Sequence, residues 1–339
     1  MIIVMKPHAT ENDIESVLGE IKEMGYKPRV IKGDVQTVIG AVGDENSHQS
    51  LEMLKTLEPV EQVIAVQAKH KLASREFHPE SSVVSVGGNK IGAGNFGLIA
   101  GPCGVESIEQ MHQVCKDLSA VGVKILRGGA YKPRTSPYDF QGLGEEGLEI
   151  LAEMKRVYGM AIVTELVGVP YVEKVAEVAD MIQIGARNCQ NFNLLEVAGA
   201  AGKPVMLKRG MSVTVKEWLS CAEYLMVHGC PDVILCERGI RTFETATRNT
   251  LDLGAVAAVK KESHLPVIID PSHAAGRLDL VLPLSKAGIA VGADGIVVES
   301  HPCPHKALSD AAQQIPSAAF GDYLKAIEPY VELYTQSFK

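Results

Sequence analysis

The sequence lacks long basic runs, long hydrophobic runs and any paired arrangement of cysteines. Its formal net charge of -8 and the absence of a basic cluster argue against a general nucleic-acid-binding protein. No hydrophobic run approaches the length that crosses a bilayer, and the apolar opening 1–5 is too short for the core of a signal peptide. Seven cysteines at irregular spacings favour a reducing compartment over a disulfide-stabilised secreted fold. We therefore expect a cytoplasmic protein with no nucleic-acid partner and no membrane partner.

The first part of the chain predicts a small α+β domain. At 339 residues, with 46% hydrophobic and 22% charged residues, the chain is long enough for one large globular domain and one small one. Within residues 1–70 the hydrophobic periodicity predicts the order β-α-β-β-α-β, which is the split arrangement of ferredoxin-like folds. The expected elements are strands at 2–5, 28–31, 37–42 and 60–66 and helices at 11–24 and 47–57. Residues 71–82 are polar and without pattern, which predicts a linker.

The remaining residues, 83–339, predict an α/β fold, a closed (β/α)8 TIM barrel. Their number is close to the roughly 250 residues of such barrels, and short apolar runs alternate with amphipathic stretches. The expected strands are 98–100, 124–127, 161–165, 181–184, 204–208, 233–237, 266–270 and 295–299. An open doubly wound sheet is the alternative, but eight repeats without a glycine fingerprint favour closure. An extra strand pair at 83–91 is expected at the barrel floor, and a last helix at 320–338 outside it.

Almost every expected barrel strand ends in a residue capable of chemistry. Because the carboxyl ends of all barrel strands meet at one face, these side chains are expected to converge. The cations among them are Arg127, Lys132, Arg134, Arg187, Lys208 and Arg238. One phosphate rarely needs six cations, so we expect a pocket for two phosphates and a carboxylate. The backbone at Gly185 and Ala186 offers further N–H donors for a phosphate.

A second group at the same face predicts a metal site. It contains one thiol, one imidazole and two carboxylates, from Cys103, His273, Glu299 and Asp310. Taken singly, each residue has an alternative structural role. The cysteine could be a small buried hydrophobic residue, the histidine could cap a helix, and the acids could be solvated or capping groups. The arginines and lysines likewise have structural ion pairs as an alternative. Their joint placement favours a divalent metal beside an anion pocket.

Three runs, together with the Cys-His-Glu-Asp set, resemble those of 3-deoxy-D-arabino-heptulosonate 7-phosphate (DAHP) synthases. The runs are Lys132-Pro-Arg-Thr-Ser136, Ile184-Gly-Ala-Arg187 and Asp270-Pro-Ser-His273. The resemblance is closest to the short-barrel type I subgroup with an N-terminal ferredoxin-like (ACT-like) regulatory domain. It implies a transferase that condenses phosphoenolpyruvate with D-erythrose 4-phosphate and water, giving DAHP and phosphate in the first step of the shikimate pathway. It also implies one divalent metal ion of the Mn, Fe, Co or Zn class.

The resemblance assigns roles to the strand-end residues. The metal ligands would be Cys103, His273, Glu299 and Asp310. The phosphoenolpyruvate site would contain Arg127, Ala186, Arg187, Lys208 and Arg238, and the erythrose phosphate site would contain Arg134 and Thr135. Lys132 would lie near the reacting carbons, and Lys132 and Glu165 are candidates for proton transfer. Catalysis would then rest on Lys132 and Glu165 together with the metal ligands Cys103 and His273.

Other functions remain open at this point. A 3-deoxy-D-manno-octulosonate 8-phosphate synthase would use arabinose 5-phosphate, but it typically carries an Asn-Arg-Ser-Ser-like run where this chain has Pro133–Ser136. A Schiff-base aldolase would use Lys132 or Lys208 and would not respond to a chelator. A non-catalytic amino-acid sensor on a decayed barrel is the third alternative, against which the near-complete set of strand-end residues argues.

Regulation is expected from the N-terminal domain and from one cysteine. By resemblance, tyrosine or phenylalanine would act as feedback inhibitor between the N-terminal domains of neighbouring subunits in a homotetramer. The stretch His301-Pro-Cys303-Pro-His305 departs from the family pattern. It is either an incidental proline-stiffened loop or the source of a disulfide between Cys303 and Cys103 that would stop metal binding.

Overall fold

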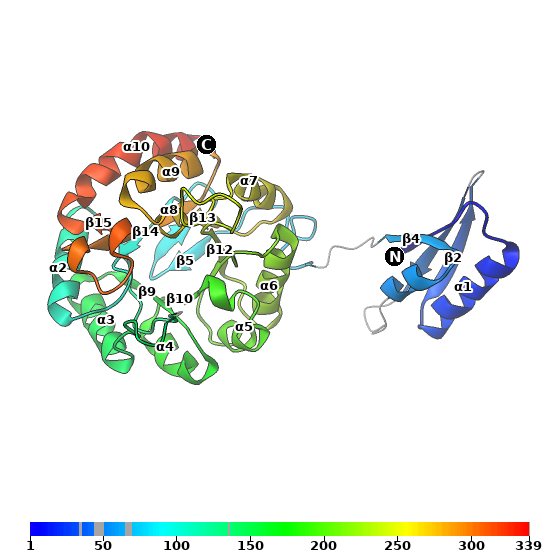
Figure 1. Cartoon of the computed structure of the whole chain (residues 1–339), viewed down its shortest axis with the longest axis horizontal. Coiled ribbons are helices and arrows are strands. Elements are labelled where there is room, and N and C mark those ends of the chain that lie inside the picture. Colours follow the sequence, from blue (N-terminus) through cyan, green and yellow to red (C-terminus); the bar gives the residue numbers. More distant parts are fainter. Residues whose placement is uncertain (34–35, 44–50, 65–69, 135, 339) are drawn as a thin grey trace. The chain divides into compact units, whose positions relative to one another are not determined.

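The computed structural model describes residues 1–33, 36–43, 51–64, 70–134 and 136–338. Close contacts divide the chain into two units, Met1–Lys69 and His70–Lys339, both drawn in Figure 1. Among the described residues, no helix is long and apolar enough to cross a membrane.

The first unit is a small α+β fold built on an antiparallel sheet. Strands β1 (Ile2–Met5), β2 (Lys27–Lys32), β3 (Thr37–Val42) and β4 (Val60–Ile64) pair in the order β2-β3-β1-β4. Helix α1 (Glu11–Glu23) begins at a capping box, in which Thr10 and Asp13 satisfy each other's backbone N–H groups. Its buried face and the inner side of the sheet share one apolar core. The small α+β domain predicted from periodicity is confirmed.

The second expected helix of this unit differs from the prediction. Residues 51–56 form a 3-10 helix, η1 (Leu51–Thr56), and residues 47–50 of the predicted helix lie outside the described residues. Residues 65 and 66 of the predicted last strand also lie outside them.

The second unit is a closed parallel barrel, as predicted. In the described part of the chain its eight strands are β7 (Gly97–Gly101), β8 (Ile125–Arg127), β9 (Ala161–Glu165), β10 (Met181–Ile184), β11 (Val205–Lys208), β12 (Val233–Glu237), β13 (Val267–Ile269) and β14 (Gly295–His301). Each strand pairs with the next in parallel, β14 pairs with β7, and the pairing of β13 with β14 completes the ring. A two-residue strand, β15 (Ile315–Pro316), pairs in parallel with the last two residues of β14.

Helices surround the ring of strands (Figure 1). They are α2 (Ile108–Ala120), α3 (Glu145–Tyr158), α4 (Val172–Val178), α5 (Phe192–Gly199), α6 (Val215–Val227), α7 (Leu253–Glu262), α8 (Pro271–Ala275), α9 (Leu278–Ala290) and α10 (Phe320–Gln336). Their apolar faces and the outward side chains of the strands form the larger core, and the fully buried Trp218 is its largest side chain. Because the barrel is packed on both sides, its strands are apolar almost throughout and change to polar residues only at their carboxyl ends.

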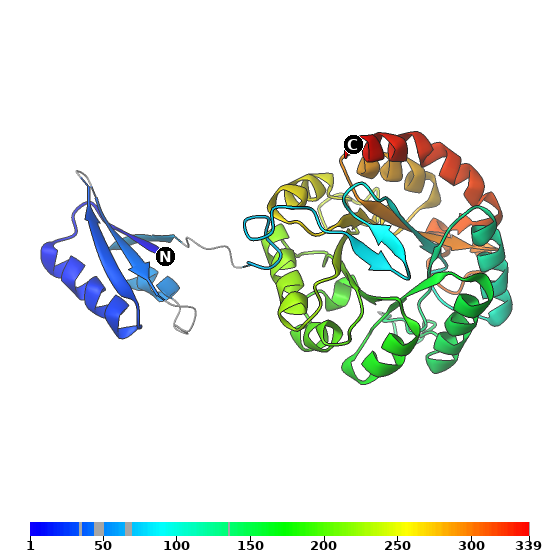
Figure 2. The ribbon, with the colours of Figure 1, turned by 180° about the vertical axis from the view of Figure 1, so that it is seen from behind.

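A hairpin closes the end of the barrel at which the amino ends of the strands lie. Strands β5 (Val84–Val86) and β6 (Asn89–Ile91) form the predicted strand pair, which is antiparallel and lies in front of the barrel in Figure 2. Val84, Val86 and Ile91 are buried among the inward side chains of the barrel strands. Gly87 in the turn lies against Ala161, the first residue of β9. The interior is therefore filled from the amino-terminal end, and the carboxyl end is left for a site.

Residues 71–82, predicted as a linker, lie against the barrel unit. The carboxylate of Glu223 on α6 accepts hydrogen bonds from the backbone N–H groups of Lys71, Leu72 and Ala73 at 2.8–2.9 Å. His264 contacts the carbonyl of Leu72 at 2.6 Å through Nε2 and the hydroxyl of Ser82 at 2.7 Å through Nδ1. These contacts attach the segment to helices and loops far away in the sequence.

Candidate active site

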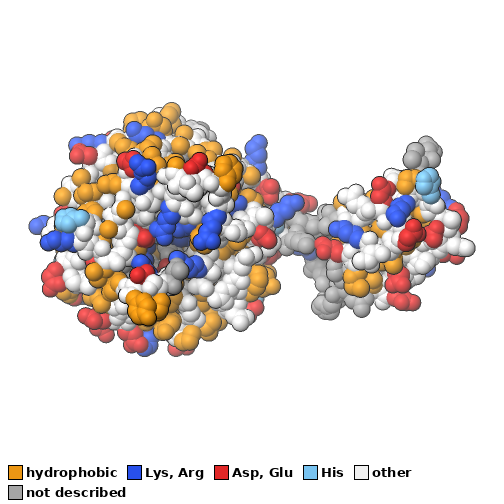
Figure 3. Space-filling model, viewed as in Figure 1, with side chains coloured by type: hydrophobic (Ala, Val, Ile, Leu, Met, Phe, Trp, Pro, Cys, Tyr) orange, Lys and Arg blue, Asp and Glu red, His pale blue; other side chains and the backbone are white. Residues whose placement is uncertain are grey.

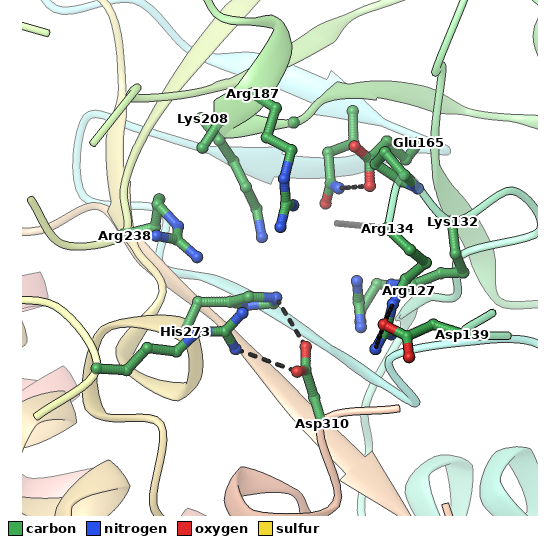
Figure 4. Close-up of a pocket in the computed structure, with 15 residues that line it drawn as sticks. Arg127, Lys132, Arg134, Asp139, Glu165, Arg187, Lys208, Arg238, His273 and Asp310 are labelled. Atoms are coloured by element: carbon green, nitrogen blue, oxygen red, sulfur yellow. Dashed lines mark hydrogen bonds and ion pairs between the residues drawn. The ribbon is translucent and has the colours of Figure 1, made fainter. Parts of the chain in front are cut away.

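A pocket of about 150 Å³ opens at the carboxyl ends of the barrel strands. In Figure 3 the Lys and Arg side chains gather in the hollow at the centre of this face, and Figure 4 shows the side chains that line it. All six predicted cations line the pocket, with Glu165, Ala186, His273 and Asp310 among the other residues of its wall. Thr135, the remaining predicted substrate contact, lies outside the described residues.

The six cations reach the pocket from the ends of four strands, β8, β10, β11 and β12. Arg127 and Lys208 are the last residues of β8 and β11, and Arg238 follows β12 directly. Arg187 lies in a short 3-10 helix, η3 (Ala186–Asn188), after β10. The loop after β8 supplies Lys132 and Arg134. The spacing of barrel strands thus converts six positions, distant in sequence, into one positive surface.

Two of these cations are buried beside carboxylates. Nζ of Lys208 lies 2.5 Å from Oδ2 of Asp270, and both side chains are at most 4% exposed. NH1 of Arg127 donates to Oε1 of Glu299 at 2.9 Å and to the carbonyl of Pro102 at 2.8 Å. Such pairs keep the charges ionised where burial alone would penalise them. The structural ion pairs considered as an alternative are therefore present, but they lie in the wall of the pocket.

Other cations have fewer anionic neighbours. Arg238 is buried, and its burial lowers the pKa of the guanidinium. Arg134 donates from Nε and NH2 to Oδ2 of Asp139 at 3.3 and 3.2 Å, a pair marked in Figure 4. A buried cation stabilised by a bound anion is the arrangement expected of a phosphate site.

Glu165 is held at the pocket wall by a neighbouring amide and a glycine. Its Oε2 accepts from Nε2 of Gln183 at 3.2 Å. A Cβ added to Gly185 would lie 2.0 Å from Oε1 of Glu165, so a residue with a side chain cannot stand there unless the carboxylate moves. Gly185 thereby lets β10 approach the acid and leads directly into Ala186 and Arg187.

Cys103, Glu299 and Asp310 form a candidate metal site beside the pocket. The sulfur and one oxygen of each carboxylate all lie within 4.8 Å of one another. Sγ of Cys103 is 3.3 Å from Oδ2 of Asp310. His273 adjoins this cluster, since its Nε2 lies 3.5 Å from Oε1 of Glu299 and 3.6 Å from Oδ2 of Asp310. The structure therefore brings together all four residues predicted as ligands.

The donor set fits a divalent ion. Nδ1 of His273 lies 2.7 Å from Oδ2 of Asp270, which leaves Nε2 directed at the two carboxylates. A carboxylate behind a histidine is the usual support of a metal-bound imidazole. One sulfur, one nitrogen and two oxygen donors suit ions of the Mn, Fe, Co and Zn class better than Ca²⁺ or Mg²⁺.

The charges of the cluster also suit a cation. Burial raises the pKa of the Cys103 thiol to about 12, and the charge of Glu299 adds to the increase. Burial also acts to raise the pKa of Glu299, but the nearby His273 and Arg127 outweigh burial, so that this pKa is lowered. The pKa of Asp310 is lowered in the same way, by His273 and Arg248. Burial lowers the pKa of His273, which favours the neutral imidazole that binds metals. A divalent ion between the two carboxylates and the thiol would offset the repulsion among their negative charges.

Lys132 connects the metal cluster with the pocket. Its Nζ lies 2.9 Å from the carbonyl oxygen and 3.0 Å from the sulfur of Cys103. Burial lowers the pKa of this amine, but the nearby thiol and carboxylates outweigh burial and raise it. The side chain is thus an ammonium group at neutral pH, placed between the candidate ligands and the cavity.

Residues 12–333 match the DAHP synthetase I family. The chain is 54% identical over 328 residues to the phospho-2-dehydro-3-deoxyheptonate aldolase of Thermotoga maritima, with 97% of each chain covered. The chain belongs to the DAHP synthetase I family. Its structure matches the crystal structure of the Thermotoga maritima DAHP synthase with a TM-score of 0.92 and 52% identity, covering 98% of both chains.

Two other relatives each match a part of this chain. A 2-dehydro-3-deoxyphosphooctonate aldolase of Acidithiobacillus ferrooxidans is 30% identical over 251 residues and covers 69% of this chain. A truncated form of the Thermotoga maritima DAHP synthase matches with a TM-score of 0.74 and 53% identity, covering 79% of this chain and 98% of its own.

Sequence reasoning missed several polar residues around the site. Arg248 and Asp139 line the pocket, and Gln183 supports Glu165. Arg248 and Asp139 lie inside long loops rather than at strand ends, so no periodic signal marks them. Gln183 is the one polar residue of the otherwise apolar strand β10, and this departure from the apolar pattern could have marked it as a site residue.

Not every strand-end charge faces the pocket. Arg209 is buried and donates from NH1 to Oε2 of Glu237 at 2.9 Å and to Oδ2 of Asp252 at 3.0 Å. This network ties the ends of β11 and β12 to the start of α7 and has a structural role.

The cysteines are all reduced in this structure. All seven lie in the described part of the chain and are free thiols, including Cys103 and Cys303. The sulfur of Cys303 lies 3.4 Å from Nε2 and 3.5 Å from Nδ1 of His305. A disulfide between Cys303 and Cys103 stays a prediction for oxidising conditions.

Proposed function

We propose that this chain condenses phosphoenolpyruvate with D-erythrose 4-phosphate and water to give DAHP and phosphate, the first step of the shikimate pathway. The observation that carries the proposal is a cation-lined pocket directly beside a Cys-His-Glu-Asp cluster, in a chain 54% identical to a DAHP synthase along almost its whole length. The enzyme would be a transferase, 3-deoxy-7-phosphoheptulonate synthase. The octulosonate reaction has weaker support, since the relative of that name described above is 30% identical over 251 residues.

In this proposal the inner cations bind phosphoenolpyruvate. Arg127 and Lys208 take the carboxylate, while Arg187, Lys208 and Arg238 take the phosphate together with the backbone at Ala186. The burial of Arg127, Lys208 and Arg238 supports this assignment, because a desolvated anion gains most from buried cations.

The outer part of the pocket takes erythrose 4-phosphate. Arg134 and Thr135 would hold its phosphate. In the structure Arg134 is paired with Asp139, so the incoming phosphate competes with this carboxylate or joins it around the same guanidinium. The aldehyde end then points inward to Lys132.

The candidate ligands Cys103, His273, Glu299 and Asp310 would hold one divalent ion of the Mn, Fe, Co or Zn class. Such an ion, when bound, acts as a Lewis acid that polarises the aldehyde oxygen of erythrose 4-phosphate. Asp270 orients His273, and Lys132 contributes a positive charge at the sulfur side of the cluster.

The remaining steps fall to side chains that handle protons. Carbon 3 of phosphoenolpyruvate attacks the aldehyde carbon, and the Lys132 ammonium donates a proton to the aldehyde oxygen. Water adds to carbon 2, which carries positive charge, and Glu165 accepts a proton from it. The bond between carbon 2 and the phosphate ester oxygen then breaks, the hydroxyl on carbon 2 gives its proton to the departing phosphate, and carbon 2 becomes the ketone of DAHP. General acid–base assistance of this kind typically contributes about 10²–10⁴-fold in rate.

The reaction is tested by phosphate release from phosphoenolpyruvate in the presence of erythrose 4-phosphate. We expect release that depends on the four-carbon sugar, stops with a chelator and returns with Mn²⁺. Arabinose 5-phosphate in place of erythrose 4-phosphate is the control. Release with the five-carbon sugar alone would move the assignment to the octulosonate reaction, and chelator-insensitive release would exclude the metal role.

We further propose that the N-terminal unit senses tyrosine or phenylalanine within a cytoplasmic homotetramer. The unit has its own apolar core, and its described residues contain no cluster of the kind found in the barrel. Free cysteines fit a reducing compartment. The truncated relative supports the idea that the barrel folds without this unit.

Deletion of residues 1–69 should leave phosphate release within a few-fold of the full chain and abolish inhibition by both amino acids. Inhibition curves of both forms, measured at matched substrate saturation, test this expectation. An unchanged inhibition curve after deletion would place the regulatory site elsewhere.

A further inference from the structure

The two carboxylates of the candidate metal site each present their oxygens to different surroundings. Oδ2 of Asp310 faces Sγ of Cys103 at 3.3 Å and Nε2 of His273 at 3.6 Å. Its other oxygen, Oδ1, accepts from NH1 of Arg248 at 3.1 Å. One oxygen of Asp310 therefore faces Cys103 and His273, and the other is held by Arg248.

Glu299 shows the same division. Its Oε1 lies 3.5 Å from Nε2 of His273 and accepts from Arg127 at 2.9 Å. Its Oε2 accepts from Nε2 of Gln313 at 2.6 Å. The carbonyl oxygen of the same Gln313 side chain accepts from NH1 of Arg248 at 3.4 Å. A chain of contacts thus runs from Asp310 through Arg248 and Gln313 to Glu299.

Arg248 is itself fixed against the helix that carries His273. Its backbone N–H donates to the carbonyl of Ala275 at 3.0 Å, and the next residue, Asn249, donates to Ala274 and, through Nδ2, to the carbonyl of His273. The side chain contacts Gly276, where an added Cβ would lie 2.5 Å from Cβ of Arg248. The guanidinium is therefore placed by the same segment that places a ligand.

Asp310 needs such support because of its backbone. Its φ of 51° and ψ of 34° lie in the left-handed region, which is unfavourable for a residue with a side chain. The side chain is 19% exposed and lies in the loop between β14 and η5 (Ala311–Gln313). Without an outside partner, this loop would have several ways to turn the carboxylate away from Cys103.

We propose that Arg248, acting with Gln313, is a positioning residue that turns one oxygen of Asp310 and one of Glu299 toward Cys103 and His273. This inference rests on the proposed metal site. It adds a role for a loop of the barrel face that strand ends do not mark. The same arginine lines the substrate pocket, so it joins the metal cluster to the anion site.

The direction in which metal affinity changes when Arg248 is removed distinguishes a positioning role from a purely electrostatic one. Arg248 carries a positive charge near the site of a divalent cation, so its removal would raise metal affinity if Coulomb repulsion were all that mattered. Loss of positioning has the opposite effect, and removal of a partner behind a metal ligand typically weakens binding by about 10–100-fold. A merely structural role leaves affinity unchanged.

The experiment is a Mn²⁺ titration of the metal-free full-length protein, read as heat of binding and not as activity. We expect Arg248→Gln to weaken Mn²⁺ binding about 10–100-fold and Arg248→Lys to recover part of the loss. Arg241→Gln is the matched control, because Arg241 lies exposed in the same loop and its replacement removes the same charge. Gln313→Leu should also weaken binding, and the double variant should lose less than the product of the two single losses, since both act on one chain of contacts.

Unchanged or tighter Mn²⁺ binding in Arg248→Gln would overturn the proposal, as would an equal loss in Arg241→Gln. A loss confined to phosphoenolpyruvate binding would make Arg248 a substrate contact instead. No Mn²⁺ binding by the unaltered protein would remove both the metal site and this inference. Normal Mn²⁺ binding without phosphate release would contradict the proposed reaction alone and would leave the positioning test readable.

Discussion

Replacing Lys132 with Met is expected to lower kcat by about 10²–10⁴-fold, the range that a proton donor in the transition state contributes. The structure supports this size of effect because Nζ lies between the sulfur of Cys103, at 3.0 Å, and the cavity where substrate would bind. Methionine keeps an unbranched side chain that is shorter by one heavy atom, and it has no proton to donate. Single-turnover phosphate release with both substrates at saturation measures the loss.

Two controls separate this role from structural damage. Lys116→Met removes an exposed lysine on α2 and should leave kcat unchanged. The Mn²⁺ content of the Lys132→Met protein should match that of the unaltered protein or exceed it, because a nearby positive charge has been removed. If kcat stayed within about three-fold, proton transfer would have to be assigned to another group, with Glu165 as the next candidate.

Strand positions were well predicted because most barrel strands are short apolar runs that end in polar residues or are followed closely by them. Ala161–Glu165 and Met181–Ile184 agree with the prediction to the residue, and both end beside the site. The convergence of Cys103 with Glu299, which are far apart in sequence, followed from topology, since parallel strands of a barrel end at one face, and Asp310 lies in the loop that follows β14.

Residues that depend on loop conformation were not predictable in this way. Arg248 reaches the site only because residues 248 and 249 pair with the helix after β13, and no local pattern encodes that pairing. Asp139 is five residues beyond Arg134 in a long loop, and only the folded loop brings the two charges together.

The contacts of segment 71–82, at the other end of the barrel, could not be predicted from a local pattern either. Its polar composition is that of a linker, but the carboxylate of Glu223 supplies the acceptors for its backbone N–H groups. Backbone donors can be satisfied by a side chain about 150 residues away, and composition does not record this.

Cys103→Ser is expected to weaken the binding of soft metal ions far more than that of hard ones. The thiolate is the soft donor of the candidate cluster, and serine replaces it with an oxygen that stays protonated at neutral pH. We expect an affinity loss of at least about 100-fold for Zn²⁺ and Co²⁺, above the range for support residues, and a smaller loss for Mn²⁺, which prefers oxygen donors. Competition with a chromogenic chelator across the three ions measures the difference.

The control for this variant is a cysteine of equal burial away from the cluster. Cys115 on α2 is fully buried in the outer core, so Cys115→Ser has a similar cost to the fold without touching the site. Equal losses for all three ions in Cys103→Ser would indicate that the cysteine shapes the site without donating its sulfur. A selective loss of Zn²⁺ and Co²⁺ would assign the sulfur as a ligand and would leave His273 and the two carboxylates as the remaining site for Mn²⁺. Activity recovered with Mn²⁺ alone in that variant would then follow from the same geometry, because the oxygen donors of Glu299 and Asp310 remain in place.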